Sequence, residues 1–201
     1  RDELINTHRK KPRDAVKNIL ITLGGSDKKN VTSKIIESVK IKEEDINYNV
    51  ILGPLKEKIN VDKNIKILYS PNNMAEVFLK SDIAISSGGT TCYELLFFGV
   101  PNIIVTIAEN QINVAKNLDK MRASIYVGDK ENIEFKEIVD KVNLLIKNNN
   151  LRKEMEKNGM KLIDGNGKKR IYNEMRKINK TYEKIVLRDA KLDDAKLLLK
   201  W

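Results

Sequence analysis

Cysteine, histidine and aromatic residues are scarce in this sequence: its 201 residues include one cysteine, one histidine and 5% aromatics. A single cysteine cannot form a disulfide within the chain, so we expect a reducing, cytoplasmic location. The only histidine, His8, lies in a polar, basic segment and is a poor candidate for a general base. We therefore expect binding residues in this chain but no catalytic residue.

Long apolar runs are also missing. No run approaches the ~20 residues that a membrane-spanning helix needs, and the first residues do not resemble a secretory signal. Neither G-x-G-x-x-G nor G-x-x-x-x-G-K-[ST] occurs, which disfavours a dinucleotide fold and a P-loop ATPase. We expect no membrane span, no cofactor and no metal ion.

The chain is basic, with a formal net charge of +10. A basic domain can bind nucleic acid, but here the lysines are scattered among asparagines and isoleucines along the whole length. This pattern is typical of solvated faces, so we expect no nucleic-acid partner. The positive field still favours a polyanionic small ligand.

Six short apolar segments alternate with amphipathic segments that have the periodicity of helices. The apolar segments are residues 18–23, 48–52, 65–69, 82–85, 102–106 and 124–127. This alternation predicts an α/β fold, a doubly wound Rossmann-like parallel sheet of about six strands. In such a sheet, ligands bind outside the carboxyl ends of the strands.

Three regions differ in composition. Residues 1–17 are polar and basic and predict a linker or arm, whereas residues 18–184 contain all six expected strands and form one domain. Residues 185–201 predict a new strand and the start of a helix, and the sequence stops before they could bury a core. We interpret them as the truncated beginning of another domain.

The segment Ser86–Pro101 is the most informative one. It follows an apolar strand, and Gly88 and Gly89 allow a tight turn that leaves no side chain between the backbone and a ligand. Thr90 or Thr91 is expected to cap the helix that follows. A strand, a turn of small residues and a helix N-terminus together favour an anion such as phosphate.

Glu94 is expected on the same helix face as Thr90 and Thr91, in the first helical turn. A carboxylate beside a phosphate would be repelled, so it is better placed to accept hydrogen bonds from sugar hydroxyls. The alternative is that Glu94 only stabilises its own helix. Cys92 lies in the same turn; a nucleophilic role is possible there, but a buried, inert cysteine is favoured because no histidine is near.

Further polar groups follow other strands. Gly24, Gly25 and Ser26 come after the first strand and are expected to face the same crevice as Gly88, unless both glycine pairs merely make tight turns. Asn110 and Gln111 follow the fifth strand and suit hydroxyl or amide recognition, although Asn110 alternatively caps the next helix. Tyr69 and Met74 are candidates to pack against a flat nucleotide base, although a Met on a helix is more often part of a core.

Three motifs together resemble a known family. They are Leu23–Asp27, Ser86–Glu94 and Ala108–Gln111, and they are similar to the C-terminal half of the pseudaminic-acid pathway UDP-sugar hydrolases, which share the GT-B fold with the MurG glycosyltransferases. The likeness covers residues 1–182. It implies hydrolysis of UDP-2,4-diacetamido-2,4,6-trideoxy-β-L-altropyranose, with release of UDP and inversion at the anomeric carbon. The family's general base is a histidine of an N-terminal domain that this sequence does not include.

The resemblance also implies a UDP half-site. Gly24, Gly25 and Ser26 would approach the nucleotide-sugar, and the loop from Ser70 to Met74, next to Tyr69, would meet the uracil. The remaining residues of the half-site would contact the other parts of the ligand. These are Ser87, Gly88, Gly89, Thr90 and Thr91 at the diphosphate, Glu94 at the ribose, and Asn110 and Gln111 at the sugar or phosphate.

The tail from Ile185 is similar to the opening of GNAT acetyltransferases, which implies a longer parent protein with an N-terminal GT-B domain and an acetyltransferase domain in the same chain. Within that parent, this chain would bind UDP-sugar and be inactive alone. A GT-B glycosyltransferase with another acceptor and a non-catalytic nucleotide-sugar binding module remain as alternatives.

Overall fold

The structure is a computed structural model that describes residues 14–24, 31–39, 45–52 and 64–181. Contacts divide the chain into two units, residues 1–164 and 165–201, which are considered separately. Most of the expected arm, the turn residues Gly25 and Ser26, and the expected start of a further domain lie outside the described residues. These expectations stay predictions.

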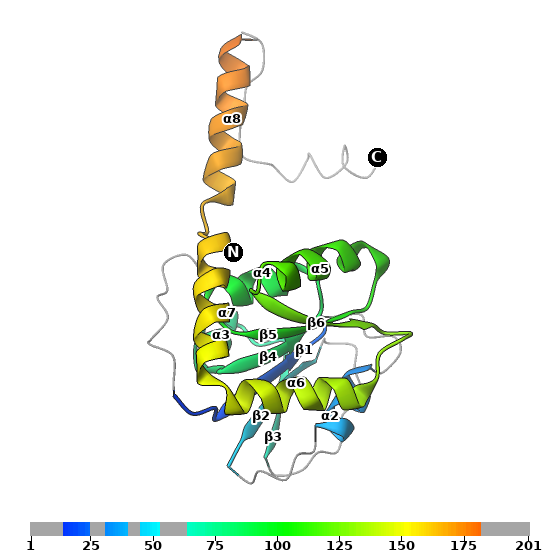
Figure 1. The fold of residues 1–201 in the computed structure, drawn as a ribbon. Helices are drawn as coiled ribbons and strands as arrows, with labels where there is room; N and C mark the ends of the chain where they lie inside the picture. Colours follow the sequence, from blue (N-terminus) through cyan, green and yellow to red (C-terminus); the bar gives the residue numbers. More distant parts are fainter. Residues whose placement is uncertain (1–13, 25–30, 40–44, 53–63, 182–201) are drawn as a thin grey trace. The chain divides into compact units, whose positions relative to one another are not determined.

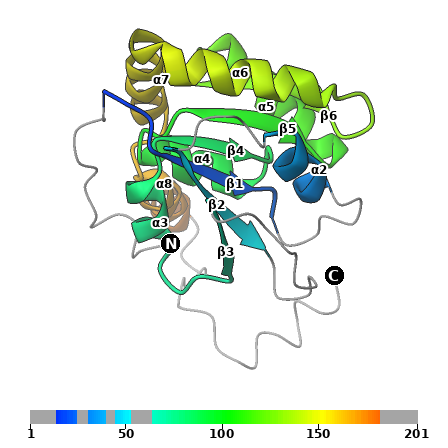
Figure 2. The ribbon, with the colours of Figure 1, turned by 90° about the horizontal axis from the view of Figure 1, so that it is seen from below.

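The first unit is built on one sheet of six parallel strands in the order β3-β2-β1-β4-β5-β6. The strands are β1 (Asn18–Thr22), β2 (Asn47–Leu52), β3 (Ile65–Tyr69), β4 (Ile83–Ser86), β5 (Asn102–Thr106) and β6 (Ser124–Asp129). The order reverses between β1 and β4, as it does in doubly wound sheets, so the predicted fold class is confirmed. Figure 2 shows β3 at the end of the sheet away from β5 and β6.

Helices cover both faces of this sheet. They are α2 (Val31–Ser38), α3 (Met74–Lys80), α4 (Thr90–Phe97), α5 (Ile112–Lys120), α6 (Phe135–Lys147) and α7 (Asn149–Leu162), with a 3-10 turn η1 (Glu109–Gln111) before α5. In Figure 1, α4 and α5 lie on one side of the sheet, and α6 and α2 on the other. Right-handed crossovers in a sheet of this order produce this arrangement.

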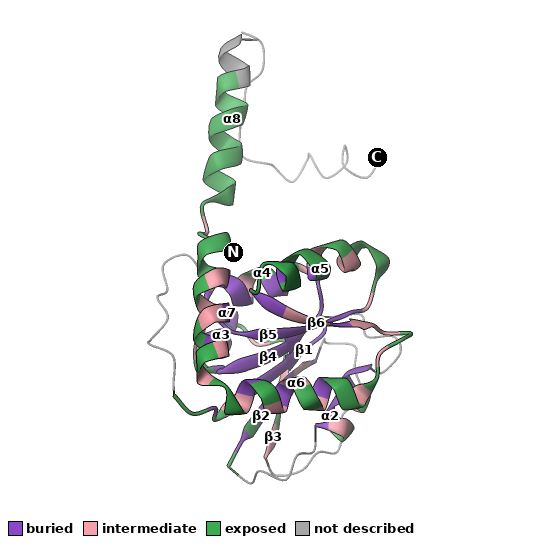
Figure 3. Ribbon diagram, in the orientation of Figure 1, coloured by how far each residue is buried: buried purple, intermediate pink, exposed green. Residues whose placement is uncertain are grey.

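The core is continuous through the strands. Ile19 and Ile21 of β1 point to the face that α2 and α6 cover, whereas Leu20 points to the face of α3 and α4. All three are less than 2% exposed, and Figure 3 shows the central strands buried along their length. Burial on both faces explains why these strands are uninterrupted apolar runs in the sequence.

A buried polar network fastens the amino ends of the strands to the α6–α7 junction. Asp82 is 7% exposed and accepts the backbone N–H groups of Lys17 and Asn18 at 2.9 and 2.8 Å. Arg152 of α7 is 4% exposed and donates to the carbonyl oxygens of Leu145 at 2.6 Å and Asp14 at 2.5 Å. Burial lowers the pKa of Arg152, while the nearby carboxylates of Asp82 and Asp14 act in the opposite direction.

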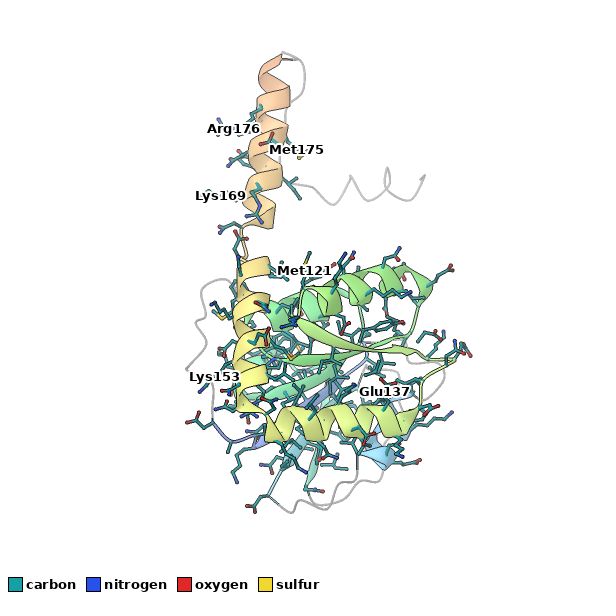
Figure 4. The ribbon with its side chains drawn as sticks, in the orientation of Figure 1. Met121, Glu137, Lys153, Lys169, Met175 and Arg176 are labelled. Atoms are coloured by element: carbon teal, nitrogen blue, oxygen red, sulfur yellow. The ribbon has the colours of Figure 1, made fainter. Side chains whose placement is uncertain are left out.

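In the second unit the structure describes one helix, α8 (Gly167–Thr181). Ile171, Tyr172 and Met175 lie on it with exposed side chains, and the Arg176 guanidinium lies 5.8 Å from the centre of the Tyr172 ring. Met175 and Arg176 are labelled in Figure 4. Throughout the part of the chain that the structure describes, we find no helix with the length and apolar character needed to span a bilayer.

Candidate functional site

Three of the motifs singled out in the sequence lie at one edge of the sheet. Gly24 follows β1, Ser87–Gly89 follows β4, and η1 follows β5. Since β4 pairs with both β1 and β5 in parallel register, the carboxyl ends of these strands are adjacent. The structure therefore brings together loops that are more than 80 residues apart in sequence (Gly24 and Gln111).

The turn between β4 and α4 leaves the start of the helix without a side-chain cap. Gly89 occupies the N-cap position in an extended conformation (φ −86°, ψ −163°). Thr90 and Thr91 are the first two helical residues, so the prediction that one of them caps α4 is wrong. The first-turn N–H groups of a helix lack intrahelical partners, and without a capping side chain they form a site suited to an anion.

Gly88 is required by a close approach. A Cβ atom added at Gly88 would lie 2.9 Å from the Cβ of Gln111 and 3.0 Å from its carbonyl oxygen. Real Cβ atoms essentially never show the first distance, and the second, to a backbone atom, is tighter than nine in ten real Cβ contacts. Gly24 differs, because it is in open space and has a φ of +90°, which L side chains rarely adopt.

Gln111 connects this turn to the loop after β5. Its side-chain oxygen accepts the backbone N–H of Ile107 at 2.9 Å, and its backbone N–H donates to the carbonyl of Ala108 at 3.0 Å. Gln111 also stands at the N-cap position of α5. The alternative that Asn110 caps α5 is therefore wrong, and Asn110 is exposed within η1.

Glu94 lies in the second turn of α4, one turn later than predicted, because the helix begins at Thr90. It is partly buried, whereas Thr90 is exposed and Thr91 half-buried. The spacing still puts Glu94 on the same helix face as both threonines. The effect of a helix dipole fades beyond the first turn, so the interpretation that Glu94 only stabilises its own helix is weakened.

Tyr69 and Met74 lie further along the sheet, at the edge strand β3 and the start of α3. Tyr69 is 46% exposed, but Met74 is 8% exposed and packs in the core cluster with Leu20 and Phe78. This placement leaves little of Met74 to face a base. Asn73 caps α3 by accepting the N–H of Glu76 at 3.1 Å.

A groove of about 410 Å³ lies beside α3, apart from the glycine turns. Asn18, Asn49, Lys66 and Leu68 contribute to it from the strands, and Lys80 from the helix. Of the predicted ligand-binding segments, the loop from Ser70 to Met74 contributes to this groove, through Pro71, Asn72 and Asn73. Among the described residues, no cluster of three or more His, Cys, Asp or Glu side chains could hold a metal ion.

Cys92 is buried beneath the start of α4. Its Sγ donates to the carbonyl of Gly89 at 2.9 Å, and burial raises the pKa of the thiol to about 11. At neutral pH the group is therefore almost entirely protonated, which makes it a weak nucleophile. The prediction that Cys92 is buried is confirmed, and its low reactivity stays a prediction.

We expect the native protein to react with a thiol-specific reagent such as DTNB at least about 100-fold more slowly than an exposed cysteine at pH 7.5, because burial limits both access and thiolate formation. The measurement is the absorbance change of the native protein, with the same protein in denaturant as the control. Reaction of the native form at the rate of the denatured form would contradict this assignment.

Comparison with known proteins agrees with the fold. The family model described as the glycosyltransferase family 28 C-terminal domain matches residues 18–182. Spore coat polysaccharide biosynthesis protein SpsG of Bacillus subtilis is 27% identical over 160 residues, which cover 75% of this chain and 47% of that protein. A Helicobacter pylori protein named pseudaminic acid cytidylyltransferase and UDP-2,4-diacetamido-2,4,6-trideoxy-beta-L-altropyranose hydrolase is 39% identical over 124 residues, or 60% of this chain and 21% of that protein.

Solved structures of glycosyltransferases share the fold. Acinetobacter baumannii MurG matches 88% of this chain and 52% of its own, with a TM-score of 0.61 and 21% identity. The calicheamicin glycosyltransferase CalG4 matches 87% of this chain and 45% of its own, with a TM-score of 0.66 and 14% identity. The chain spans less than half the length of each of the two relatives, SpsG and the H. pylori protein. With the family model matching residues 18–182, this chain belongs to the glycosyltransferase family 28 C-terminal domain family.

Proposed function

We propose that this chain is the nucleotide-binding half of a UDP-2,4-diacetamido-2,4,6-trideoxy-β-L-altropyranose hydrolase. The observation that carries the proposal is that the carboxyl ends of β1, β4 and β5 lie side by side, where β4 leads into the uncapped N-terminus of α4. The H. pylori relative, whose name includes this activity, supports the choice of substrate.

Each part of the site has a role in this proposal. The N–H groups at the start of α4 and the hydroxyls of Thr90 and Thr91 bind the diphosphate, while Ser87, Gly88 and Gly89 keep the approach free of bulky side chains. Glu94 accepts hydrogen bonds from the ribose hydroxyls, one helical turn away from the phosphates.

The other predicted residues surround the two ends of the ligand. Gly24, Gly25 and Ser26 approach the nucleotide-sugar from β1, and Asn110 and Gln111 approach the sugar from β5. Tyr69, with the loop leading to Met74, meets the uracil. Of these, Met74 has the weakest support because its side chain lies in the core.

The chemistry requires a further group. In the hydrolysis, water attacks the anomeric carbon, its proton passes to a general base, and UDP leaves with the electrons of the glycosidic bond. No histidine lies in residues 14–181, and the carboxylate that we place in the site, Glu94, is assigned to the ribose. We therefore propose that an N-terminal domain in the same polypeptide supplies the base. We also propose, from the likeness of the tail after Ile185 to acetyltransferases, that an acetyltransferase domain follows this one. This chain by itself binds UDP but does not hydrolyse the sugar nucleotide.

A second candidate is the donor-binding half of a glycosyltransferase. A Thermosipho melanesiensis relative named as an N-acetylglucosamine transferase is 27% identical over 143 residues, covering 69% of this chain and 42% of that protein. A hydrolase and a transferase would present the same nucleotide half-site, and the acceptor, water or sugar, separates them. Assays of a longer polypeptide that includes the N-terminal domain distinguish the two.

Calorimetric titration of this chain with UDP, UMP, CMP and a short duplex DNA tests the proposal. We expect UDP to bind most tightly, since it alone combines the uracil with a diphosphate. A failure to bind UDP at millimolar concentration, together with salt-dependent binding of DNA, would contradict the proposal.

Glu94→Ala is expected to weaken UDP binding by about tenfold or more, since a hydrogen bond to a charged acceptor is worth about 1.5–3 kcal/mol. The matched control is Glu137→Ala, which removes an exposed carboxylate of α6, labelled in Figure 4. Titration of both variants with UDP measures the effect. An unchanged affinity for Glu94→Ala would remove this carboxylate from the site.

A further inference from the structure

We propose that Gln111 is a positioning residue that holds the Gly88–Gly89 turn in the conformation that binds a diphosphate. This inference rests on the proposed function for the identity of the ligand. The geometry that supports it is the close approach of Gln111 to Gly88, together with the position of its side chain near Gly89.

The backbone of Gln111 packs against Gly88. The position of a Cβ atom at Gly88 is 2.9 Å from the Cβ of Gln111 and 3.0 Å from its carbonyl oxygen, and 3.5 Å from a methyl group of Thr106. Thr106 is itself buried, and its hydroxyl lies 3.1 Å from the hydroxyl of Tyr126. Gly88 is thus flanked by Thr106 at the end of β5 and by Gln111 in the loop after it, and both residues form hydrogen bonds of their own.

The side chain of Gln111 lies near Gly89. Its Nε2 is 3.7 Å from the position that a Cβ atom at Gly89 would take. Its Oε1 accepts the N–H of Ile107 at 2.9 Å, and this bond holds the side chain in place beside the turn. Gln111 is therefore anchored in the loop after β5 while it packs next to the N-cap of α4.

This link matters because the turn has little to order it. Glycine loses more conformational freedom on folding than other residues, and two in succession make a turn costly to hold in one shape. Backbone donors stabilise an anion best when they are already aimed at it before it binds. By restricting Gly88 and Gly89, Gln111 preorganises the donors of α4 without being the main contact to the ligand.

Two substitutions separate the orienting bond from the rest of the side chain. Gln111→Glu keeps an oxygen that accepts the N–H of Ile107, whereas Gln111→Met keeps the length of the side chain but loses the acceptor. We expect amide hydrogen exchange at Gly89–Cys92 to quicken several-fold in the Met variant and to stay near the wild-type rate in the Glu variant. Asn113→Ala, which removes an exposed amide from α5, is the control.

Ligand titrations give the second measurement. We expect Gln111→Met to weaken UDP binding by about tenfold while its affinity for uridine, which has no phosphate, stays unchanged. An equal loss for uridine, or exchange and UDP affinity both at the wild-type level, would overturn the role of Gln111. Faster exchange in Gln111→Glu than in the wild type would also overturn this role. This result can be obtained even if the Met variant does not fold. If the wild-type chain binds no UDP, the proposed function fails, and the exchange rates still test what Gln111 does to the turn.

Discussion

Replacing Arg152 with alanine is expected to lower the free energy of unfolding by about 3–5 kcal/mol, the range for breaking a buried, hydrogen-bonded charge. The guanidinium is almost fully buried and donates to the backbone carbonyls of Leu145, Ile146 and Asp14. Its removal leaves the Leu145 carbonyl without its donor in a buried position, and those of Ile146 and Asp14 in partly buried ones. An unsatisfied buried acceptor costs about 1–3 kcal/mol.

Chemical denaturation followed by circular dichroism measures this loss. Lys153→Ala is the matched control, because Lys153 is the next residue of α7 (Figure 4) and its side chain is 51% exposed, with an ion pair to Asp14 at 3.4 Å. Exposed ion pairs contribute about 0–1 kcal/mol, so the control should lose less than about 1 kcal/mol. A similar, small loss for both variants would show that Arg152 does not fasten the amino ends of the strands.

Gly88→Ala is expected both to destabilise the domain by about 1–3 kcal/mol and to weaken UDP binding by at least tenfold. An added methyl group would lie 2.9 Å from the Cβ of Gln111 and 3.0 Å from its carbonyl oxygen, so it has to displace that residue. The displacement separates the two loops that we propose to surround the diphosphate. Thermal melting and UDP titration of the same sample measure the two effects.

Gly89→Ala is the control for stability. A Cβ at Gly89 would meet Ser87 Oγ at 3.5 Å and Gln111 Nε2 at 3.7 Å, which are ordinary contacts. Alanine is a poorer N-cap than glycine, so we expect a loss below about 1 kcal/mol. If Gly89→Ala proved as destabilising as Gly88→Ala, the close approach at Gly88 would not be the reason for that glycine.

The strands followed from the sequence because burial on both faces makes each central strand an uninterrupted apolar run, whereas their order comes from the structure. Ile19, Leu20 and Ile21 are adjacent in sequence yet face different helices, so no alternation was needed to recognise the strand. The position of the loops after β1, β4 and β5 then followed from the rule that parallel strands end at one edge.

Several features of the site depend on tertiary contacts and had no local signal. Gly88 was expected to supply a tight turn. The structure shows instead that a glycine is needed there because Gln111, 23 residues away in sequence, packs against it. Thr90 and Thr91 have the chemistry of N-caps, yet the chain turns one residue earlier and gives that position to Gly89. Arg152 lies in a helix rich in charged residues, and only the fold shows that it points inward.

The two outer strands of the sheet bear on how copies of this chain behave at high concentration. An edge strand offers unpaired backbone groups to another sheet unless something disrupts it. β3 is five residues long and carries Lys66, which is exposed, at its second position. In β6 the pairing shifts, since Ile104 is opposite Tyr126 but Thr106 is opposite Asp129, and Gly128 adopts a φ of +117°. A charge on one edge and an irregular backbone on the other disfavour intermolecular strand pairing, so the sheet is poorly suited to grow into aggregates from either end.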